Sequence, residues 1–253
     1  MDEEEPIISD FDEIIVCPEC GHEQVIEVTP SVNVTLDPEM RDKVLSGEIF
    51  QFTCEKCGFS GFAGFPMIYE DKETNGGFLV YLEPDCPDRV VGIDGDVADK
   101  VLLNSITMRL VTTFNELKEK IFAFEAGIDD RVLELFKVLA LSNMEASEDQ
   151  AKPDELRFIQ ITEKDGEKTI SLAAFREEQY LGVLDMPYSL YQSCVITGEP
   201  IWDYPVFECG MVDAQWIHER LQADRESAAE DGCSDECCST CGHHCGGNDT
   251  HET

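Results

Sequence analysis

Two pairs of cysteines carry the clearest chemical signal in this sequence of 253 residues. Cys17 and Cys20 lie in the stretch CPECGH, and Cys54 and Cys57 lie in the stretch CEKCGF. Two thiolates separated by two residues can both reach one metal ion only if the backbone turns tightly between them. The glycine after each pair supplies the positive φ angle that such a turn needs. Together, the two pairs predict a site in which four thiolates surround one zinc ion, Zn²⁺.

A zinc ion held by four sulfurs has no open coordination position, so the expected site is structural and binds no substrate. The 33 residues between Cys20 and Cys54 exceed the usual spacing of about 15–20, and we interpret the excess as an insertion between the pairs. The neighbouring His22 is expected to be a solvated surface residue. The alternative is dithiol redox chemistry, but a redox pair would open a helix within a βαβ pattern. If bound zinc protects the four cysteines from alkylation, and no disulfide forms and breaks, the zinc site is favoured over the redox pair.

A second cysteine-rich stretch, CSDECCSTCGHHC, lies near the end of the chain. Thiolates and imidazoles together suit zinc, copper(I) or a similar soft ion. One hypothesis is therefore a second metal site used in storage, delivery or sensing. We favour a disordered tail that binds metal loosely, because no apolar residues are present to fix a selective cage. The thiols in question are Cys233, Cys237, Cys238, Cys241 and Cys245.

The charge balance excludes several classes of partner. The chain has 54 acidic and 18 basic residues, for a net charge of −36. Such a chain repels nucleic acid backbones and anionic lipid surfaces at long range, so neither is expected as a partner. No apolar run approaches the roughly 18 residues that span a bilayer, and the N-terminus lacks the pattern of a signal peptide. We therefore expect a cytoplasmic protein, in which clustered thiols are more often metal ligands than disulfides.

The elements expected to position the paired cysteines are mostly β-strands. Residues 25–36 alternate as a strand does, with an interruption at Pro30, and residues 48–54 form the strand before the second pair. Asp37 as N-cap with Pro38 after it predicts a helix that ends at Gly47. Beyond the second pair, two strands are expected to turn at residues 75–77, where Asn-Gly-Gly is a hairpin signal.

Two amphipathic helices follow in the sequence. Thr113 and Glu116 form a capping box at the start of the first helix, and Asp129 or Asp130 caps the second. We expect them to form an αα-hairpin that packs on the sheet. After a polar linker, residues 155–224 predict a small α+β unit. Its expected elements are a hairpin turning at 165–166, a short helix opened by Pro187, a strand over 204–212, and a last helix capped by Asp213.

The order of these segments resembles the CpXC family of bacterial proteins, which is named for its Cys-Pro-x-Cys motif. The resemblance covers residues 14–141, through the segments CPECG, VNVTLDPE, FTCEKCG and VTTFNELKEKIFAFEAGIDDRVLEL. It implies a zinc-ribbon-like domain with the two cysteine pairs as ligands, and it implies no activity. The second pair departs from the name-giving motif, because Glu-Lys stands where the first pair has Pro-Glu.

The predicted fold class is α+β, with a zinc-ribbon-like β-sheet domain and an αα-hairpin, then a small α+β unit and a disordered tail. The predicted divisions are an acidic segment (1–13), the CpXC-like zinc-ribbon domain (14–141), a linker (142–154), the α+β unit (155–224) and the Cys/His-rich tail (225–253).

Three functional hypotheses follow from these residues. The first, which we favour, is a non-enzymatic zinc-binding protein that uses a closed structural site and binds another protein. The alternative is a metal-handling protein in which the tail is the working part. The third is a hydrolase or redox enzyme that uses the α+β unit. We consider it weaker because the sequence holds no phosphate-binding loop, nucleophile elbow or H-E-x-x-H motif.

Overall fold

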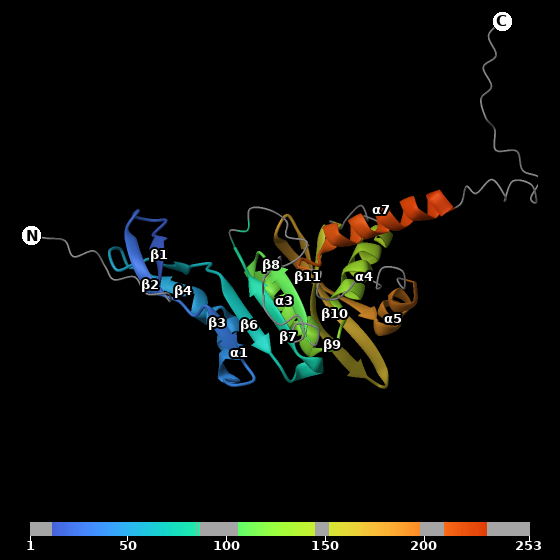
Figure 1. Ribbon diagram of the computed structural model, residues 1–253, viewed down its shortest axis with the longest axis horizontal. Coiled ribbons are helices and arrows are strands. Elements are labelled where there is room, and N and C mark those ends of the chain that lie inside the picture. The colour runs from blue at the N-terminus through green and yellow to red at the C-terminus, as the bar shows by residue number, and fades with distance from the viewer. Residues whose placement is uncertain (1–11, 85, 87–105, 145–151, 198–209, 232–253) are drawn as a thin grey trace, which may run out of the picture.

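The computed structural model describes residues 12–84, 86, 106–144, 152–197 and 210–231. These residues form an α+β protein with eleven strands in four sheets and five α-helices, which confirms the α+β class of the predicted fold. The molecule is elongated. The cysteine hairpins lie at one end and the C-terminal helix lies at the other (Figure 1).

Two small antiparallel hairpins carry the paired cysteines. The first hairpin joins β1 (Asp12–Val16) to β2 (Glu23–Glu27), and the second joins β4 (Gln51–Thr53) to β5 (Ser60–Phe62). The residues from Glu48 to Phe50, expected as part of a strand, form a short 3₁₀ helix (η1) before β4.

A four-stranded mixed sheet follows the hairpins, in the order β3-β6-β7-β8. Its strands are β3 (Ser31–Asn33), β6 (Met67–Asp71), β7 (Phe78–Leu82) and β8 (Thr107–Val111). The antiparallel β6 and β7 bury alternate residues, as expected for strands with one covered face. They turn at the predicted Asn-Gly-Gly segment, where Asn75 has a φ of 51°.

Helix α1 (Glu39–Ser46) lies in the insertion between the two cysteine hairpins, and its start corrects the sequence prediction. Pro38 is the N-cap, not Asp37, and no side chain caps the helix. The reason is that the backbone N–H of Asp37 donates to the carbonyl of Asn33, so Asp37 belongs to the preceding turn. The end is as predicted, because Gly47 takes a φ of 76° as C-cap.

Helix α3 (Phe114–Glu125) begins with the predicted capping box of Thr113 and Glu116. It lies between the mixed sheet and a second sheet (Figure 1), and it contacts both β7 and β9. Its residues are divided between two hydrophobic cores. Leu117 and Ile121 pack into the core of the mixed sheet, whereas Ala123 belongs to the other core.

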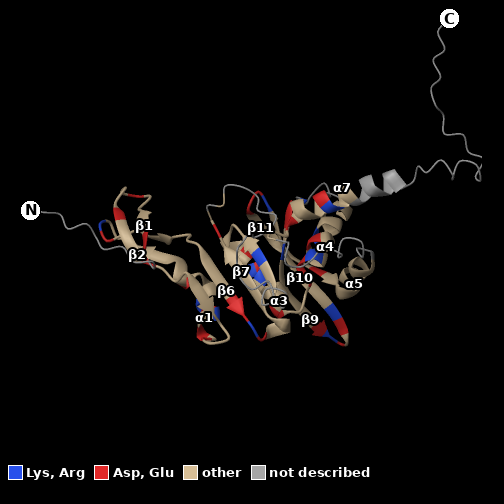
Figure 2. Ribbon diagram, viewed as in Figure 1, with Lys and Arg blue, Asp and Glu red and all other residues tan. Residues whose placement is uncertain are grey.

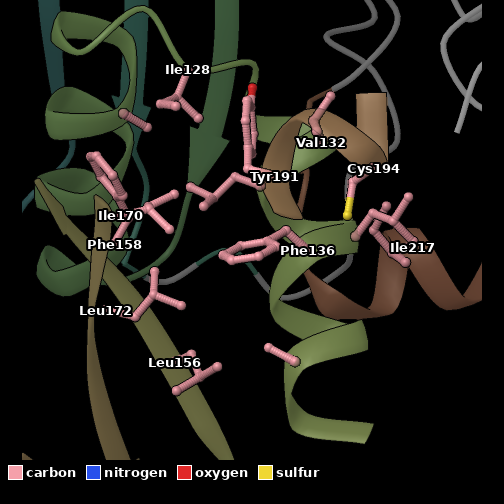
Figure 3. Packing of buried hydrophobic residues seen from close by; sticks show 14 of the residues in the cluster. Ile128, Val132, Phe136, Leu156, Phe158, Ile170, Leu172, Tyr191, Cys194 and Ile217 are labelled. Atoms are coloured by element: carbon pink, nitrogen blue, oxygen red, sulfur yellow. The ribbon is translucent and has the colours of Figure 1, made fainter. Parts of the chain in front are cut away.

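The second sheet is antiparallel, in the order β11-β10-β9, and α4, α5 and α7 complete this half of the molecule. Figure 3 shows how α4 places Val132 and Phe136 in this core opposite Leu156, Phe158 and Leu172 of the sheet. The elements are β9 (Glu155–Lys164), β10 (Glu167–Arg176), β11 (Gln179–Pro187), α4 (Asp130–Asn143), α5 (Tyr188–Thr197) and α7 (Ala214–Asp231).

The C-terminal half shows further differences from the sequence analysis. Strand β11 was not expected, and Pro187 ends it before α5 begins. Helix α7 starts after Asp213, which caps the backbone N–H of Trp216, and it continues to Asp231, beyond the predicted start of the tail at residue 225. The strand expected over 204–212 lies mostly outside the described residues, and the five tail cysteines lie entirely outside them.

Six charged side chains form a buried network where the two halves meet. Arg109 donates two hydrogen bonds of 2.7 Å to Asp130, and Lys120 donates to the same carboxylate at 2.9 Å. Lys137 joins Glu119 to Glu134, at 3.0 Å and 2.9 Å respectively. The three positive and three negative groups offset one another, as buried charges must.

Charged residues are spread over the described elements. Figure 2 shows acidic residues on elements from β1 to α7, not on a single face. Among the described helices, none combines the length and the apolar character that crossing a membrane requires.

Candidate metal centre

Each cysteine pair lies in the turn of its own hairpin, and the two turns have the same hydrogen bonds. In the first turn, the N–H of Gly21 donates to the carbonyl of Cys17 at 2.9 Å, and the N–H of Cys17 donates to the carbonyl of His22 at 2.9 Å. In the second, Gly58 donates to Cys54 at 2.9 Å. The two segments therefore fold alike because their sequences share the C-x-x-C-G pattern.

Glycine is required in these turns by its backbone conformation. Gly21 has a φ of 67° and Gly58 has a φ of 74°, the region that side chains disfavour. A Cβ atom at either position would meet no atom within 4 Å. The reason for glycine is therefore the φ angle and not a lack of space.

The four predicted sulfurs converge. Cys17 Sγ lies 3.6 Å from Cys57 Sγ, and Cys20 Sγ lies 3.7 Å from Cys54 Sγ. All four sulfurs lie within 4.8 Å of one another, and they are the only group of this kind in the part of the chain that the structure describes. The distances are too long for disulfide bonds, which need about 2.05 Å. They are close to about 3.8 Å, the edge of a tetrahedron with metal–sulfur bonds of about 2.3 Å.

Burial differs among the four cysteines. Cys17 and Cys54 are buried and pack with Phe52 and Ala63 in a small hydrophobic cluster. Cys20 is half-buried and Cys57 is exposed. Cys17 and Cys54 therefore fix one side of the four-sulfur group in the protein interior, and Cys57 lies on its surface side.

Backbone N–H groups and neighbouring sulfurs shift the pKa values of two of the thiols in opposite directions. The backbone N–H groups of Cys57 and Lys56 donate to Cys54 and lower the pKa of its thiol to about 6. The N–H of Phe59 also lowers the pKa of Cys57, but desolvation and the neighbouring sulfurs outweigh it and raise the value to about 12. Four thiolates this close repel one another, so a cation is needed before all of them ionise.

One residue of the site was missed by the sequence analysis. Gln24, on β2, is buried, and its side-chain amide reaches across to the second hairpin. Its Nε2 donates to the carbonyl of Thr53 at 3.1 Å, and its Oε1 accepts from the N–H of Glu55 at 3.0 Å. These are the residues on either side of Cys54, so Gln24 holds one hairpin in register with the other. His22, next to the first pair, is not in the sulfur group.

The site is connected to the rest of the protein by aromatic side chains. Phe50 precedes β4 and contacts Phe62 of β5, with ring centres 5.1 Å apart. Both rings contact Phe114, the first residue of α3, at 5.3 Å and 5.2 Å. The second hairpin therefore rests on the start of the helix that lies between the two sheets.

The geometry defines a protein with two cysteine hairpins that meet at one four-sulfur centre, within an α+β fold. Comparison with known proteins agrees with this. The family model described as CpXC protein matches residues 15–137, so this part of the chain is similar to CpXC proteins, as the resemblance in sequence predicted. The searches of curated proteins and of solved structures found no significant match.

Proposed function

We propose that Cys17, Cys20, Cys54 and Cys57 hold one zinc ion as a closed structural site. The observation that carries this proposal is the convergence of four thiols at separations close to the edges of a zinc–sulfur tetrahedron. The family match supports it, because the match includes both cysteine pairs. The zinc-ribbon-like character of the sheet and the pairing of α3 with α4 as an αα-hairpin belong to the same proposal.

Elemental analysis of the purified protein tests the metal. We expect one zinc per chain, and serine at Cys54 should remove most of the metal and loosen both hairpins. Serine at Cys194, which is buried in the other core, is the matched control and should leave the zinc content unchanged. Absence of zinc from the unmodified protein, or full retention in the Cys54→Ser variant, contradicts the proposal.

We further propose that the protein is not an enzyme and works by binding another protein. A closed four-sulfur site offers no position for a substrate, and nucleic acid is disfavoured by the net charge of −36. The outer face of the first hairpin supports a protein partner. Ile14 is 55% exposed and Val16 is 59% exposed, whereas Ile15 between them packs toward the cysteines. Ile14 and Val16 are alternate residues of β1, so their exposed side chains lie on the same face of the hairpin.

A double replacement of Ile14 and Val16 by aspartate tests this contact surface. We expect an unchanged zinc content and the loss of a protein that the unmodified chain captures from lysate. Capture that is equal for both chains contradicts a role for this hairpin face.

A further inference from the structure

A cavity of about 200 Å³ lies far along the chain from the cysteine hairpins, where α3 and α4 meet the start of β9 and the residues that lead into α7. None of the four cysteines lines it. An apolar cavity of about 150 Å³ in another protein holds benzene. This cavity therefore has room for a compound of about eight non-hydrogen atoms.

The wall of the cavity has more negative than positive groups. Two ammonium groups, those of Lys120 and Lys137, stand against six carboxylates. The carboxylates belong to Glu116, Glu119, Glu134, Asp154, Glu155 and Asp213.

Both lysines already use their hydrogen-bond donors within the protein. Lys137 donates to both oxygens of Glu119, at 3.0 Å and 3.2 Å, and to Glu134 at 2.9 Å. Lys120 donates to Asp130 at 2.9 Å and to the carbonyl of Val212 at 2.6 Å, and its Nζ also lies 3.7 Å from Glu134. Both ammonium groups are therefore directed at acceptors of the protein itself, and the groups that the cavity offers to a ligand are mainly carboxylates.

Glu134 is the carboxylate whose bonding is incomplete. Its residue is only 3% exposed, and both of its contacts with lysine pass through Oε1. Within the described residues, Oε2 accepts no hydrogen bond. Burial raises the pKa of Glu134 above its ordinary value. An added donor next to Oε2, on the cavity wall, would give this oxygen a hydrogen bond and would favour the ionised form.

The remaining wall is apolar and includes Leu110, Leu141 and Leu156. A ligand that matches the whole cavity is therefore a short methylene chain with an ammonium group at each end. We propose that the cavity binds a small aliphatic diamine of the size of 1,4-diaminobutane, with Glu134 as the carboxylate that anchors one ammonium group. This inference does not depend on the zinc site.

Calorimetric titration of the full chain with 1,4-diaminobutane tests the inference, in about 0.15 M salt so that long-range attraction is screened. We expect one saturable site per chain. Butane-1,4-diol has the same length but no charge and should not bind. The Glu134→Gln variant should bind the diamine about 10- to 100-fold more weakly, the range expected for a lost hydrogen bond to a charged group.

The matched control is Glu163→Gln, which removes the same charge from an exposed position on β9. It should leave the affinity unchanged. An equal loss in both variants would show general attraction to an acidic protein and overturn the inference, as would the absence of a saturable site.

A second variant keeps the test decisive if Glu134→Gln does not fold, which circular dichroism and the zinc content reveal. Leu141→Phe fills part of the cavity from a half-buried position and removes no charge. Loss of diamine binding in the folded Leu141→Phe variant supports the site, and unchanged binding overturns it.

Discussion

Gln24 lies next to the sulfur centre without being part of it. Its amide bonds the backbone on both sides of Cys54, so it determines how the second hairpin faces the first. Outer contacts of this kind orient metal ligands and commonly change metal affinity by about 10- to 100-fold.

Alanine at Gln24 should therefore weaken zinc binding by about tenfold, because it removes both hydrogen bonds of the Gln24 side chain to the second hairpin. Competition with a chromogenic chelator measures the change. Gln160→Ala is the control, since Gln160 is an exposed glutamine on strand β9. If both variants bind zinc as the unmodified protein does, the bridge has no effect on the metal.

The second glycine of the paired turns gives another prediction for a single residue. Gly58→Ala forces a side chain into a positive φ of 74°, which costs about 1–2 kcal/mol. Gly58→Asn should be milder, because asparagine tolerates this conformation better than alanine. Urea denaturation of the zinc-loaded proteins should rank glycine above asparagine and asparagine above alanine. The reverse order would show that the turn does not need this backbone angle.

Single residues differ in how well the sequence predicts them. The four cysteines and two glycines form a local pattern with a direct physical cause, so their arrangement could be predicted. Gln24 could not, because alternation along a strand assigns a residue to a face without showing what lies opposite that face.

Among the elements, the helix α4 departs most from expectation. Its charged residues Glu134 and Lys137 have the spacing of a solvated helix face, yet both are buried. They are buried because α4 is enclosed by α3, α5, α7 and β9, and partners distant in sequence offset their charges. The local sequence predicts the helix and its N-cap. The burial of its charged residues depends on elements from other parts of the chain, so the local sequence does not predict it.

Asp130 is the residue of this network whose removal should be most damaging. Burial alone would raise the pKa of Asp130, but Arg109 and Lys120 outweigh burial and hold it well below its usual value. Asp130→Asn leaves both cations without their shared carboxylate, and loss of one partner from a buried pair costs about 3–5 kcal/mol. Urea denaturation at neutral pH measures this loss.

The effect of Asp130→Asn should depend on pH with a definite sign. A carboxyl with a depressed pKa stabilises the fold above its unfolded value of about 3.9, and this contribution is lost as the pH falls. The difference in unfolding free energy between the two proteins should therefore shrink below about pH 4. Asp165→Asn, in the exposed turn between β9 and β10, should show neither effect. A difference that stays constant with pH would show that Asp130 is not held ionised by its partners.

Strand β11 illustrates a limit of sequence reasoning at the level of elements. Its residues QYLGVLDMP contain a glycine and end in proline, which obscures the alternation that predicts a strand. The pairing with β10 also shifts register between Ala174 and Phe175, and such irregularities are not visible in a hydrophobic pattern. By contrast, the Asp165-Gly166 dipeptide predicts the hairpin of β9 and β10. Both residues take positive φ angles at its turn, the conformation that this dipeptide favours.

On the scale of the whole molecule, the unexplained part of the sequence is the cysteine-rich tail, which lies outside the described residues. Truncation after Asp231, the end of α7, should leave the zinc content at one per chain, because the tail has no apolar residues to fix a selective site. Elemental analysis of the intact and the shortened protein decides this. A drop in tightly bound zinc on truncation would instead favour the metal-handling alternative.

The α+β class and the cysteine centre could be predicted because both depend on local patterns. The arrangement of two sheets around α3 could not, since it depends on which apolar faces meet. Residues on opposite sides of α3, such as Ile121 and Ala123, enter different cores, and a helical pattern alone does not identify two separate neighbours for one helix.

The position of α3 between the sheets has a practical consequence for anyone who divides this protein. Cutting the chain between α4 and β9 would remove the sheet that covers Val132, Phe136 and their neighbours. The N-terminal fragment would then expose a hydrophobic surface. A fragment ending at residue 144, just after α4, should therefore aggregate or bind a dye such as ANS strongly, whereas the full chain should not. Light scattering measures the aggregation and fluorescence measures the dye binding. A fragment that neither aggregates nor binds the dye would mean that the N-terminal half folds independently.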